Sequence, residues 1–281
     1  MITRFAPSPT GPLHLGHAFA AFVAWDLAKA GGGQFLLRIE DIDRSRAGDA
    51  WERQIYEDLK WLGLSWPEPV MRQSERQPAY DAALDRLWAE GLLYPCDCSR
   101  RDILEAASAP QEGAPPHGPD GVIYPGTCRP VAPPSGPRPR EATLRLDMRR
   151  ALKSLSRLSY LETGDGRHER IEITDAHLIE EVGDPVLARR DMATSYHLSV
   201  VVDDAAQGIT CVTRGADLAP ATAIHVLLQH LLGLPVPSYH HHRLIRDDEG
   251  KRLAKRDDAR AIARYRDDGL SPADIRAKIG L

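Results

Sequence analysis

The first seventeen residues constrain the fold more than any other segment of the chain. From residue 4 they read Arg-Phe-Ala-Pro-Ser-Pro-Thr-Gly-Pro-Leu-His-Leu-Gly-His. Proline fixes φ and removes a backbone donor, so the turn over residues 7–12 excludes both a helix and a strand ladder. Residues 1–6 leave room for one short buried strand, and a helix can begin only near Gly16. Apolar residues at helical spacing predict that helix over residues 17–30, before three glycines end it.

This succession of strand, turn and helix is typical of a nucleotide site. The N-terminal end of a helix carries unpaired N–H groups and a positive partial charge, which together favour a bound phosphate. His14 and His17 offer further hydrogen-bond donors at this end, and Gly16 lets the backbone and a flat base come close. Two histidines at a helix start also occur as capping or surface residues, and the pattern by itself leaves that alternative open.

The string as a whole resembles the first signature of the class I aminoacyl-tRNA synthetases of the glutamyl and glutaminyl branch. The resemblance implies an α/β fold with a doubly wound, Rossmann-type parallel sheet, and it implies ATP as a substrate together with Mg²⁺. Residues 252–256 resemble the second signature of this family, Lys-Leu-Ser-Lys-Arg, although a basic segment of this kind is commonly an exposed turn. Arg252 replaces the first lysine and Ala254 the serine, which puts closure of this loop in doubt. Lys255 keeps the second lysine.

The expected reaction needs positive charge rather than a nucleophilic side chain. When a carboxylate attacks the α-phosphate of ATP, negative charge builds on the phosphoryl oxygens and on the departing pyrophosphate. The resemblance therefore implies four catalytic residues: His14, His17, Arg252 and Lys255.

An amino-acid pocket for glutamate must satisfy two carboxylates and one ammonium, so it requires at least two arginines and one acid. The resemblance implies these substrate-binding residues: Arg4, Phe5, Ala6, Pro7, Ser8, Glu40, Tyr196 and Arg214. The charged residues between 38 and 44 have an alternative interpretation as an ion-pair lattice. We prefer that interpretation for Asp41, Asp43 and Arg44.

Three cysteines suggest a metal site. Cys96, Cys98 and Cys128 lie within 33 residues and bracket a proline-rich segment that has little apolar content to fold on its own, and a tetrahedral Zn²⁺ would hold such a segment together. The resemblance to the glutamyl-queuosine branch of the family favours Tyr124 as the fourth ligand. His117 is the more ordinary choice chemically and stays open. Cys211, in a predicted strand, is expected in the core.

Further elements follow from periodicity and breakers. Strands are predicted over residues 34–41, 142–146, 171–173, 198–202 and 209–213, and helices over 49–62, 78–90 and 219–232. Residues 108–140 hold ten prolines and five glycines, so no regular element is expected there. The predicted division is 1–94 and 186–240 for the two halves of the nucleotide-binding domain, 95–185 for an inserted zinc-containing subdomain of the acceptor type, and 241–281 for the signature loop and a short helical segment begun by Ser271.

Composition sets the broad class. A chain of 281 residues with 42% apolar and 27% charged residues is long enough for one catalytic domain with a smaller module. It has no run of eighteen apolar residues and no secretory signal. We therefore expect a cytoplasmic protein, a monomer, with no membrane or DNA partner.

An RNA partner is compatible with the net charge of −4, because RNA binding needs only a local basic stripe. One candidate stripe, which could equally be a solvated mixed-charge face, consists of Arg138, Arg140, Arg145, Arg149, Arg150, Lys153, Arg157, Arg167 and Arg170.

Only 25 residues follow Arg256, fewer than the ~50 of a minimal domain, so we expect no anticodon-binding domain. In this respect the chain resembles the stand-alone glutamyl-queuosine branch. That resemblance implies transfer of L-glutamate to the queuosine base in the anticodon loop of tRNA(Asp). The alternatives are a truncated glutamyl-tRNA synthetase that charges a tRNA 3′ end, and a non-catalytic protein that binds tRNA or amino acid.

Overall fold

A parallel sheet forms the centre of the protein. The computed structural model describes residues 1–108, 117–155, 157–246 and 260–281. Strand β1 (Ile2–Phe5) pairs in parallel with β2 (Gln34–Ile39), and β2 with β3 (Met71–Arg72). On the other side of β1, the Thr210 amide donates to the Ile2 carbonyl over 3.0 Å, which places the following strand β11 (Cys211–Gly215) next to β1. Strand β11 pairs in parallel with β12 (Ser238–His242). The strand order is therefore β3-β2-β1-β11-β12, which reverses at β1 and β11.

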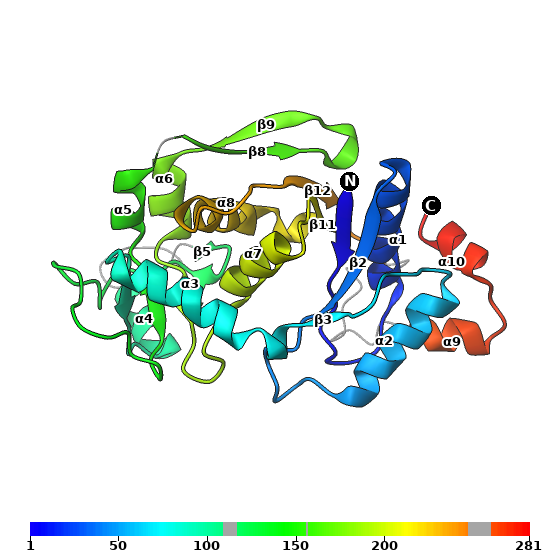
Figure 1. Ribbon diagram of the computed structural model, residues 1–281, viewed down its shortest axis with the longest axis horizontal. Helices are drawn as coiled ribbons and strands as arrows, with labels where there is room; N and C mark the ends of the chain where they lie inside the picture. The colour runs from blue at the N-terminus through cyan, green and yellow to red at the C-terminus, as the bar shows by residue number, and fades with distance from the viewer. Residues whose placement is uncertain (109–116, 156, 247–259) are drawn as a thin grey trace.

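Helices cover both faces of this sheet (Figure 1). One side holds α1 (Leu15–Ala30), α2 (Asp49–Trp61), α9 (Ile262–Asp267) and α10 (Pro272–Lys278). The other side holds α3 (Gln77–Ala89), α7 (Tyr196–Ala206) and α8 (Thr222–Leu231). Each side has its own buried apolar cluster, one around Phe22 and Ile39 and the other around Leu84 and Leu227. The predicted α/β class with a parallel sheet is confirmed.

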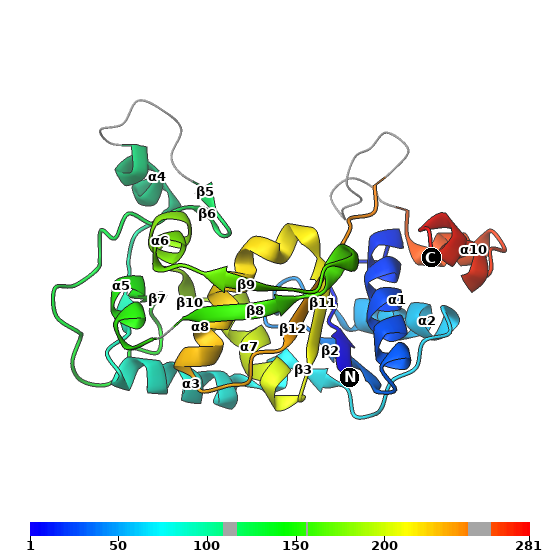
Figure 2. The same cartoon turned by 90° about the horizontal axis from the view of Figure 1, so that it is seen from above.

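Residues between the two halves of the sheet build a second layer beside it (Figure 2). The strands β4 (Leu93–Pro95), β7 (Leu144–Leu146) and β10 (Val186–Ala188) form an antiparallel sheet in the order β10-β7-β4. Strand β8 (Leu158–Glu162) does not belong to this second layer: it pairs in parallel with β12, and β9 (Glu169–Ile173) pairs antiparallel with β8, so both strands extend the central sheet beyond β12. Both β4 and β10 lie at the boundaries predicted for the inserted subdomain, and the division itself stays a prediction.

The remaining elements are short. They comprise helices α4 (Arg100–Ser108), α5 (Met148–Ala151) and α6 (Asp175–His177), a π-helical turn (Leu178–Val182), and 3₁₀ turns at Gln73–Glu75, Leu152–Ser154, Gly164–Gly166 and Ala216–Ala221. Within the described ranges, no helix has both the length and the apolarity needed to cross a membrane.

The strand predicted over residues 198–202 is wrong, because these residues belong to helix α7. The Ser195 side chain caps this helix by accepting the Leu198 amide over 3.4 Å. Because α7 is buried on most of its surface, its apolar residues form a continuous run instead of the one-sided pattern of a surface helix. Tertiary burial overrides the strand preference of the three consecutive valines.

The expectation of no regular element over residues 108–140 is also wrong. Within the described residues of that range, β5 (His117–Gly118) and β6 (Gly121–Val122) form a small antiparallel hairpin. Two glycines allow this hairpin to form and to pack closely. Gly121 has a φ of +98°, and a Cβ on Gly118 would lie 2.2 Å from the carbonyl oxygen of Glu181. The hairpin can therefore pack directly on the backbone of the π-helical turn.

Candidate active site

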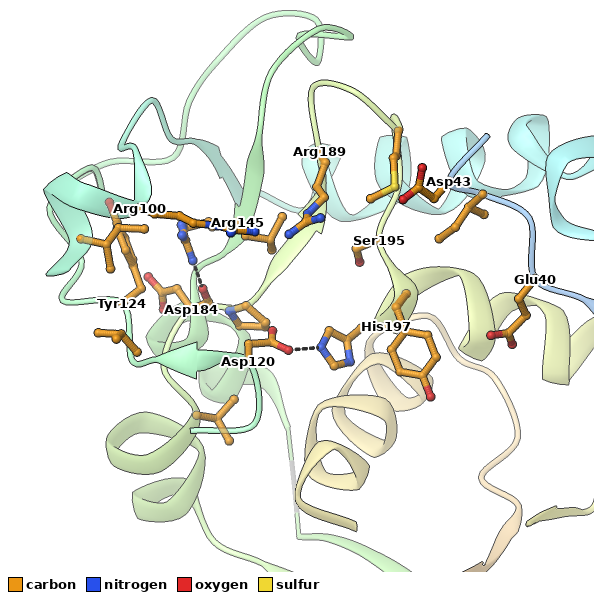
Figure 3. A pocket seen from close by; sticks show the side chains of 18 of the residues that line it. Glu40, Asp43, Arg100, Asp120, Tyr124, Arg145, Asp184, Arg189, Ser195 and His197 are labelled. Atoms are coloured by element: carbon orange, nitrogen blue, oxygen red, sulfur yellow. Dashed lines mark hydrogen bonds and ion pairs between the residues drawn. The ribbon is translucent and has the colours of Figure 1, made fainter. Parts of the chain in front are cut away.

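A cavity of about 780 Å³ opens beside the carboxyl ends of the central strands. Ser8 and Tyr196 line this cavity. Figure 3 shows Glu40 at one end of it, and Tyr124 and Arg145 at the opposite end, next to the inserted segment. The carboxyl ends of strands, at the point where the strand order reverses, are where open α/β sheets bind ligands. The cavity thus connects the expected amino-acid site with the cysteine-containing region.

The two signature histidines cap helix α1. The Gly16 amide donates to His14 Nδ1, and the His14 amide donates to His17 Nδ1, each over 3.1 Å. A neutral imidazole that accepts at Nδ1 carries its proton on Nε2. These capping bonds place the proton of each neutral ring on Nε2, and both rings lie at the positive end of the helix, where phosphates bind.

Arg4 belongs to a buried cluster of two arginines and two acids. Its Nε and Nη2 donate to the Asp204 carboxylate over 2.9 and 3.2 Å. Arg38 donates to the same carboxylate over 2.7 Å and to Glu40 over 3.2 Å. Burial opposes ionisation of Asp204, but Arg4 and Arg38 outweigh it and lower its pKa. Burial raises the pKa of Glu40 against the opposing charge of Arg38. The cluster pairs two positive with two negative groups.

Arg214 has a different environment. Only 6% of the residue is exposed, yet within the described part of the chain no carboxylate lies within ion-pair distance of it. Its guanidinium donates to Thr222 Oγ1 over 2.6 Å and to His225 and His241 over 2.9 and 3.2 Å. The guanidinium also interacts with the Tyr196 side chain, which lines the cavity. Arg214 is thus a buried positive centre that neutral groups hold next to the cavity.

The other predicted substrate-binding residues divide between core and cavity. Phe5 is buried in the apolar cluster around α1, Ala6 is half-buried, and the Pro7 carbonyl accepts the Glu40 amide over 3.0 Å. Ser8 lines the cavity. The Pro7 contact holds the turn against the end of β2.

The flanks of the second signature meet the first. The Ile262 amide donates to the Leu13 carbonyl over 2.8 Å, and Ala261 forms a β-bridge with His14. Ile245, on the other flank, packs in the apolar cluster around α1. Arg252 and Lys255 themselves lie outside the described residues.

The three predicted metal-ligating cysteines come together. The sulfur atoms of Cys96, Cys98 and Cys128 all lie within 4.8 Å of one another. The Tyr124 hydroxyl lies 3.4 Å from Cys96 Sγ and 3.5 Å from Cys98 Sγ, and it accepts the Cys128 amide over 2.7 Å. His117 lies on β5, paired with Val122. Cys211 is buried in β11, as predicted for a core residue.

Comparisons with known proteins agree with this site. The family described as tRNA synthetases class I (E and Q), catalytic domain, matches residues 1–281. The chain belongs to this family. It is 64% identical over 287 residues to the glutamyl-Q tRNA(Asp) synthetase of Rhodobacter capsulatus, with all of both chains covered. It is 45% identical to the protein of that name from Nocardia farcinica, covering 98% of this chain and 82% of the relative.

A solved structure of a synthetase has the same fold as this chain. A glutamate tRNA ligase from Elizabethkingia meningosepticum, in complex with its amino acid, superimposes with a TM-score of 0.69 at 30% identity. The match covers 92% of this chain and 52% of that structure, so the chain spans about half the length of this relative.

Sequence reasoning missed several groups of this synthetase site. Asp204, which follows the segment predicted as a strand over residues 198–202, lies on α7 and accepts hydrogen bonds from two arginines. His197, His225 and Asp120 form a hydrogen-bonded set between Arg214 and the cavity, and no local pattern singled them out. The one available signal was that His197 directly follows Tyr196.

The basic stripe expected on this synthetase is interrupted. Arg138 is 7% exposed and donates to Asp81 and Asp85 over 2.7 and 2.6 Å. Arg145 is 8% exposed and lies over the Tyr124 ring at 3.8 Å. Both side chains are buried against partners within the protein, whereas Arg149, Lys153, Arg157, Arg167 and Arg170 are exposed.

The charged residues after β2 have partners within the protein, but among the described residues Asp43 alone of Asp41, Asp43 and Arg44 has an ionic partner, so the ion-pair lattice expected for Asp41 and Arg44 is not present. Asp41 accepts the Ser74 amide over 2.8 Å, and Arg44 donates to the Ser74 carbonyl over 3.0 Å. Asp43 pairs with Arg46 over 2.5 Å, although both also line the cavity.

Proposed function

We propose that this protein activates L-glutamate with ATP and transfers the glutamyl group to the queuosine base in the anticodon loop of tRNA(Asp). The single observation that carries the glutamate assignment is Arg214, a buried guanidinium without a carboxylate partner among the described residues. A substrate carboxylate would supply the missing negative charge. The names of the relatives, including the one 64% identical, support the acceptor.

The residues of the amino-acid end have separate roles in this proposal. Arg214 and Tyr196 bind one carboxylate, and Arg4 supports the pocket through Asp204 and Arg38. Glu40 accepts the substrate ammonium, whose positive charge would offset the burial that raises the Glu40 pKa. The turn from Phe5 to Ser8 forms the wall between amino acid and nucleotide.

The nucleotide end uses charge and position. In the first step a glutamate carboxylate oxygen attacks the α-phosphorus of ATP, an O–P bond forms, and the bond to pyrophosphate breaks. His14 and His17 donate to the phosphates from the start of α1. Lys255 and Arg252 would neutralise the charge that builds on pyrophosphate, and the contact of Ile262 with Leu13 supports their approach. Mg²⁺ is expected to enter with the ATP phosphates.

The transfer step requires the acceptor to reach the same cavity. A hydroxyl of the modified base attacks the activated carbonyl carbon, the acyl–phosphate bond breaks, and AMP leaves with the hydroxyl proton. Arg100 and Arg189 line the part of the cavity away from Glu40 and are candidates to contact the RNA backbone.

We further propose that one Zn²⁺ binds Cys96, Cys98, Cys128 and Tyr124. The donor set fits, because three thiols and a phenol oxygen already converge, and zinc–sulfur bonds of roughly 2.3 Å place tetrahedral sulfurs within such distances. The ion would join the residues after β4 to those after β6. The domain division, a monomeric state, a cytoplasmic location and the absence of membrane and DNA partners complete the proposal.

Two assays separate this function from the alternatives. Glutamate-dependent exchange of labelled pyrophosphate into ATP is expected, with far less exchange for glutamine; no exchange would favour a non-catalytic binding protein. Labelled glutamate should then transfer to tRNA(Asp) that carries queuosine and not to its unmodified transcript. The ester should survive removal of the 3′-terminal adenosine, whereas charging of unmodified tRNA(Glu) would favour a truncated synthetase.

A further inference from the structure

A continuous chain of hydrogen bonds runs from Arg214 to the cavity surface. Arg214 Nη1 lies 2.9 Å from His225 Nδ1, His225 Nε2 lies 3.0 Å from His197 Nδ1, and His197 Nε2 lies 2.7 Å from Asp120 Oδ1. These groups come from β11, α8, α7 and the β5–β6 hairpin. Figure 3 shows the last contact, between His197 and Asp120, at the cavity.

A second, shorter chain leaves the same guanidinium in another direction. Arg214 Nε donates to His241 Nε2 over 3.2 Å, and His241 Nδ1 lies 2.5 Å from Glu162 Oε2. Arg214 thus has two acidic end groups: two imidazoles separate it from Asp120, and one imidazole separates it from Glu162.

The donors and acceptors along both chains are determined by Arg214. A guanidinium only donates, so His225 must accept at Nδ1 and His241 at Nε2. The proton of neutral His225 is then on Nε2 and is donated to His197 Nδ1, so His197 in turn donates from Nε2 to Asp120. Neutral His241 carries its proton on Nδ1 and donates to Glu162. Burial, followed by the charge of Arg214, lowers the pKa of His225, which keeps this imidazole neutral.

We propose that His225 and His197 are positioning residues that orient the Arg214 guanidinium for the substrate carboxylate, with Asp120 as the end group that fixes their tautomers. This inference rests on the proposed function, because it assigns the supports of the same carboxylate site. The inference means that the β5–β6 hairpin, whose Asp120 lies 94 residues before Arg214 in the chain, contributes to the affinity for the amino acid.

The arrangement has a physical advantage because the carboxylate of Asp120 is not in direct contact with Arg214. A carboxylate in direct contact neutralises an arginine, as Asp204 does for Arg4. Behind two imidazoles, the carboxylate of Asp120 orients Arg214 through hydrogen bonds, while its charge is too distant to compete strongly with a substrate. Asp120 has a side chain that is 50% exposed, which weakens that competition further.

The tautomers provide a test that needs no activity. With ¹⁵N-labelled histidine, long-range ¹H–¹⁵N correlation spectra at pH 7.5 should show His197 and His225 protonated on Nε2 and His241 on Nδ1, with each ring assigned from its His→Gln variant. Protonation of His225 on Nδ1 would overturn the inference. That spectrum says nothing against glutamate activation, so the two failures are distinguishable.

Kinetics test the link to the substrate. Asp120→Ala should raise the glutamate KM in pyrophosphate exchange roughly 3- to 30-fold, with little change in kcat or in the ATP KM. Asp120→Asn should restore most of this affinity, because the amide oxygen still accepts from His197. A merely structural role would lower kcat and thermal stability together and would not distinguish the two substrates.

His230 provides the matched control. It lies on α8, as His225 does, but at the surface, where its Nδ1 contacts the Val226 carbonyl. His230→Ala should leave the glutamate KM unchanged. An unchanged glutamate KM in Asp120→Ala, in protein that exchanges pyrophosphate normally, would overturn the inference and leave the proposed function in place.

Discussion

Arg4 and Asp204 form a two-pronged ion pair that joins the first strand to helix α7. The guanidinium Nε and Nη2 contact the two carboxylate oxygens over 2.9 and 3.2 Å, and both side chains are buried. Arg38 contacts the same carboxylate, so one acid holds two arginines. Removing one partner from such a pair leaves charge without compensation in a region shielded from water.

We predict that Asp204→Asn lowers the free energy of unfolding by about 3–5 kcal/mol. The pKa of Asp204 is lowered by the two arginines, so its contribution is present above the ordinary aspartate pKa and is lost as pH falls through the lower, folded-state pKa. Urea denaturation at pH 7 measures the effect. Asp43→Asn, which breaks an exposed pair with Arg46, is the control and should cost less than about 1 kcal/mol; equal effects would contradict the assigned importance of the buried pair.

We predict that Arg214→Gln weakens glutamate recognition by about 2–5 kcal/mol, because a buried carboxylate would lose its charged partner. The glutamate KM in pyrophosphate exchange should rise, the ATP KM should stay the same, and the preference for glutamate over glutamine should shrink. Arg140→Gln changes an exposed arginine and is the control. A selective rise in the ATP KM would place Arg214 elsewhere in the mechanism.

We predict that Lys255→Ala raises the activation barrier by about 2–4 kcal/mol while glutamate binding stays nearly unchanged, because the lysine charge acts as pyrophosphate develops. Arg252→Ala should have the smaller effect, since this residue replaces the family lysine. Single-turnover adenylate formation measures both. A change confined to the glutamate KM would contradict the assigned role.

We predict one Zn²⁺ per chain, measured by elemental analysis of the purified protein. A Cys96→Ser, Cys128→Ser double variant should lose it, because zinc prefers thiolate ligands. Removal of the metal should loosen the segment after β6 before the nucleotide site unfolds. Tyr124→Phe and His117→Ala then decide the fourth ligand: the first should weaken zinc binding and the second should not.

We predict that Asp58→Asn stabilises the protein at pH 8 by about 1–3 kcal/mol. Asp58 is fully buried, its carboxylate oxygens accept no hydrogen bond within the described residues, and Arg266 lies 3.5 Å away. Burial raises its pKa to about 6. The protonated form therefore stabilises the fold below about pH 4, and this contribution is lost as pH rises through 6.

Thermal unfolding between pH 4 and pH 8 checks the Asp58 prediction. The two proteins should converge near pH 4, and Glu141→Gln, at an exposed position elsewhere in the chain, should behave like the wild type. Lower stability of Asp58→Asn at pH 8 would mean that the attraction to Arg266 outweighs burial.

Local features of the sequence predicted the elements that depend on local physics. The proline turn, the helix after Gly16 and the helix begun by Ser271 are present, the last with Ser271 and Asp274 in a reciprocal cap. The three cysteines also meet, since their spacing across one loop was informative.

Contacts across long separations could not be predicted in this way. Whether residues 198–202 form a strand or a helix depends on burial on all sides, which only the complete fold provides. The resemblance implies that Arg4 binds the substrate. In the structure Arg4 forms a bidentate bond to Asp204, which lies 200 residues later in the chain. The hydrogen bonds that fix the tautomers around Arg214 join six separate elements, β8, β11, β12, α7, α8 and the β5–β6 hairpin, so no window of sequence contains them.

The bond between Ile262 and Leu13 has a consequence for how the chain folds during synthesis. Leu13, Arg4 and Asp26 leave the ribosome early, yet their partners Ile262, Asp204 and Arg276 are made 200–250 residues later. Contacts of such high sequence separation form slowly, so apolar surface stays exposed until the later residues have been made. We therefore expect nascent chains arrested before residue 262 to lack a completed nucleotide site and to depend on chaperones, although the first signature is translated long before that residue.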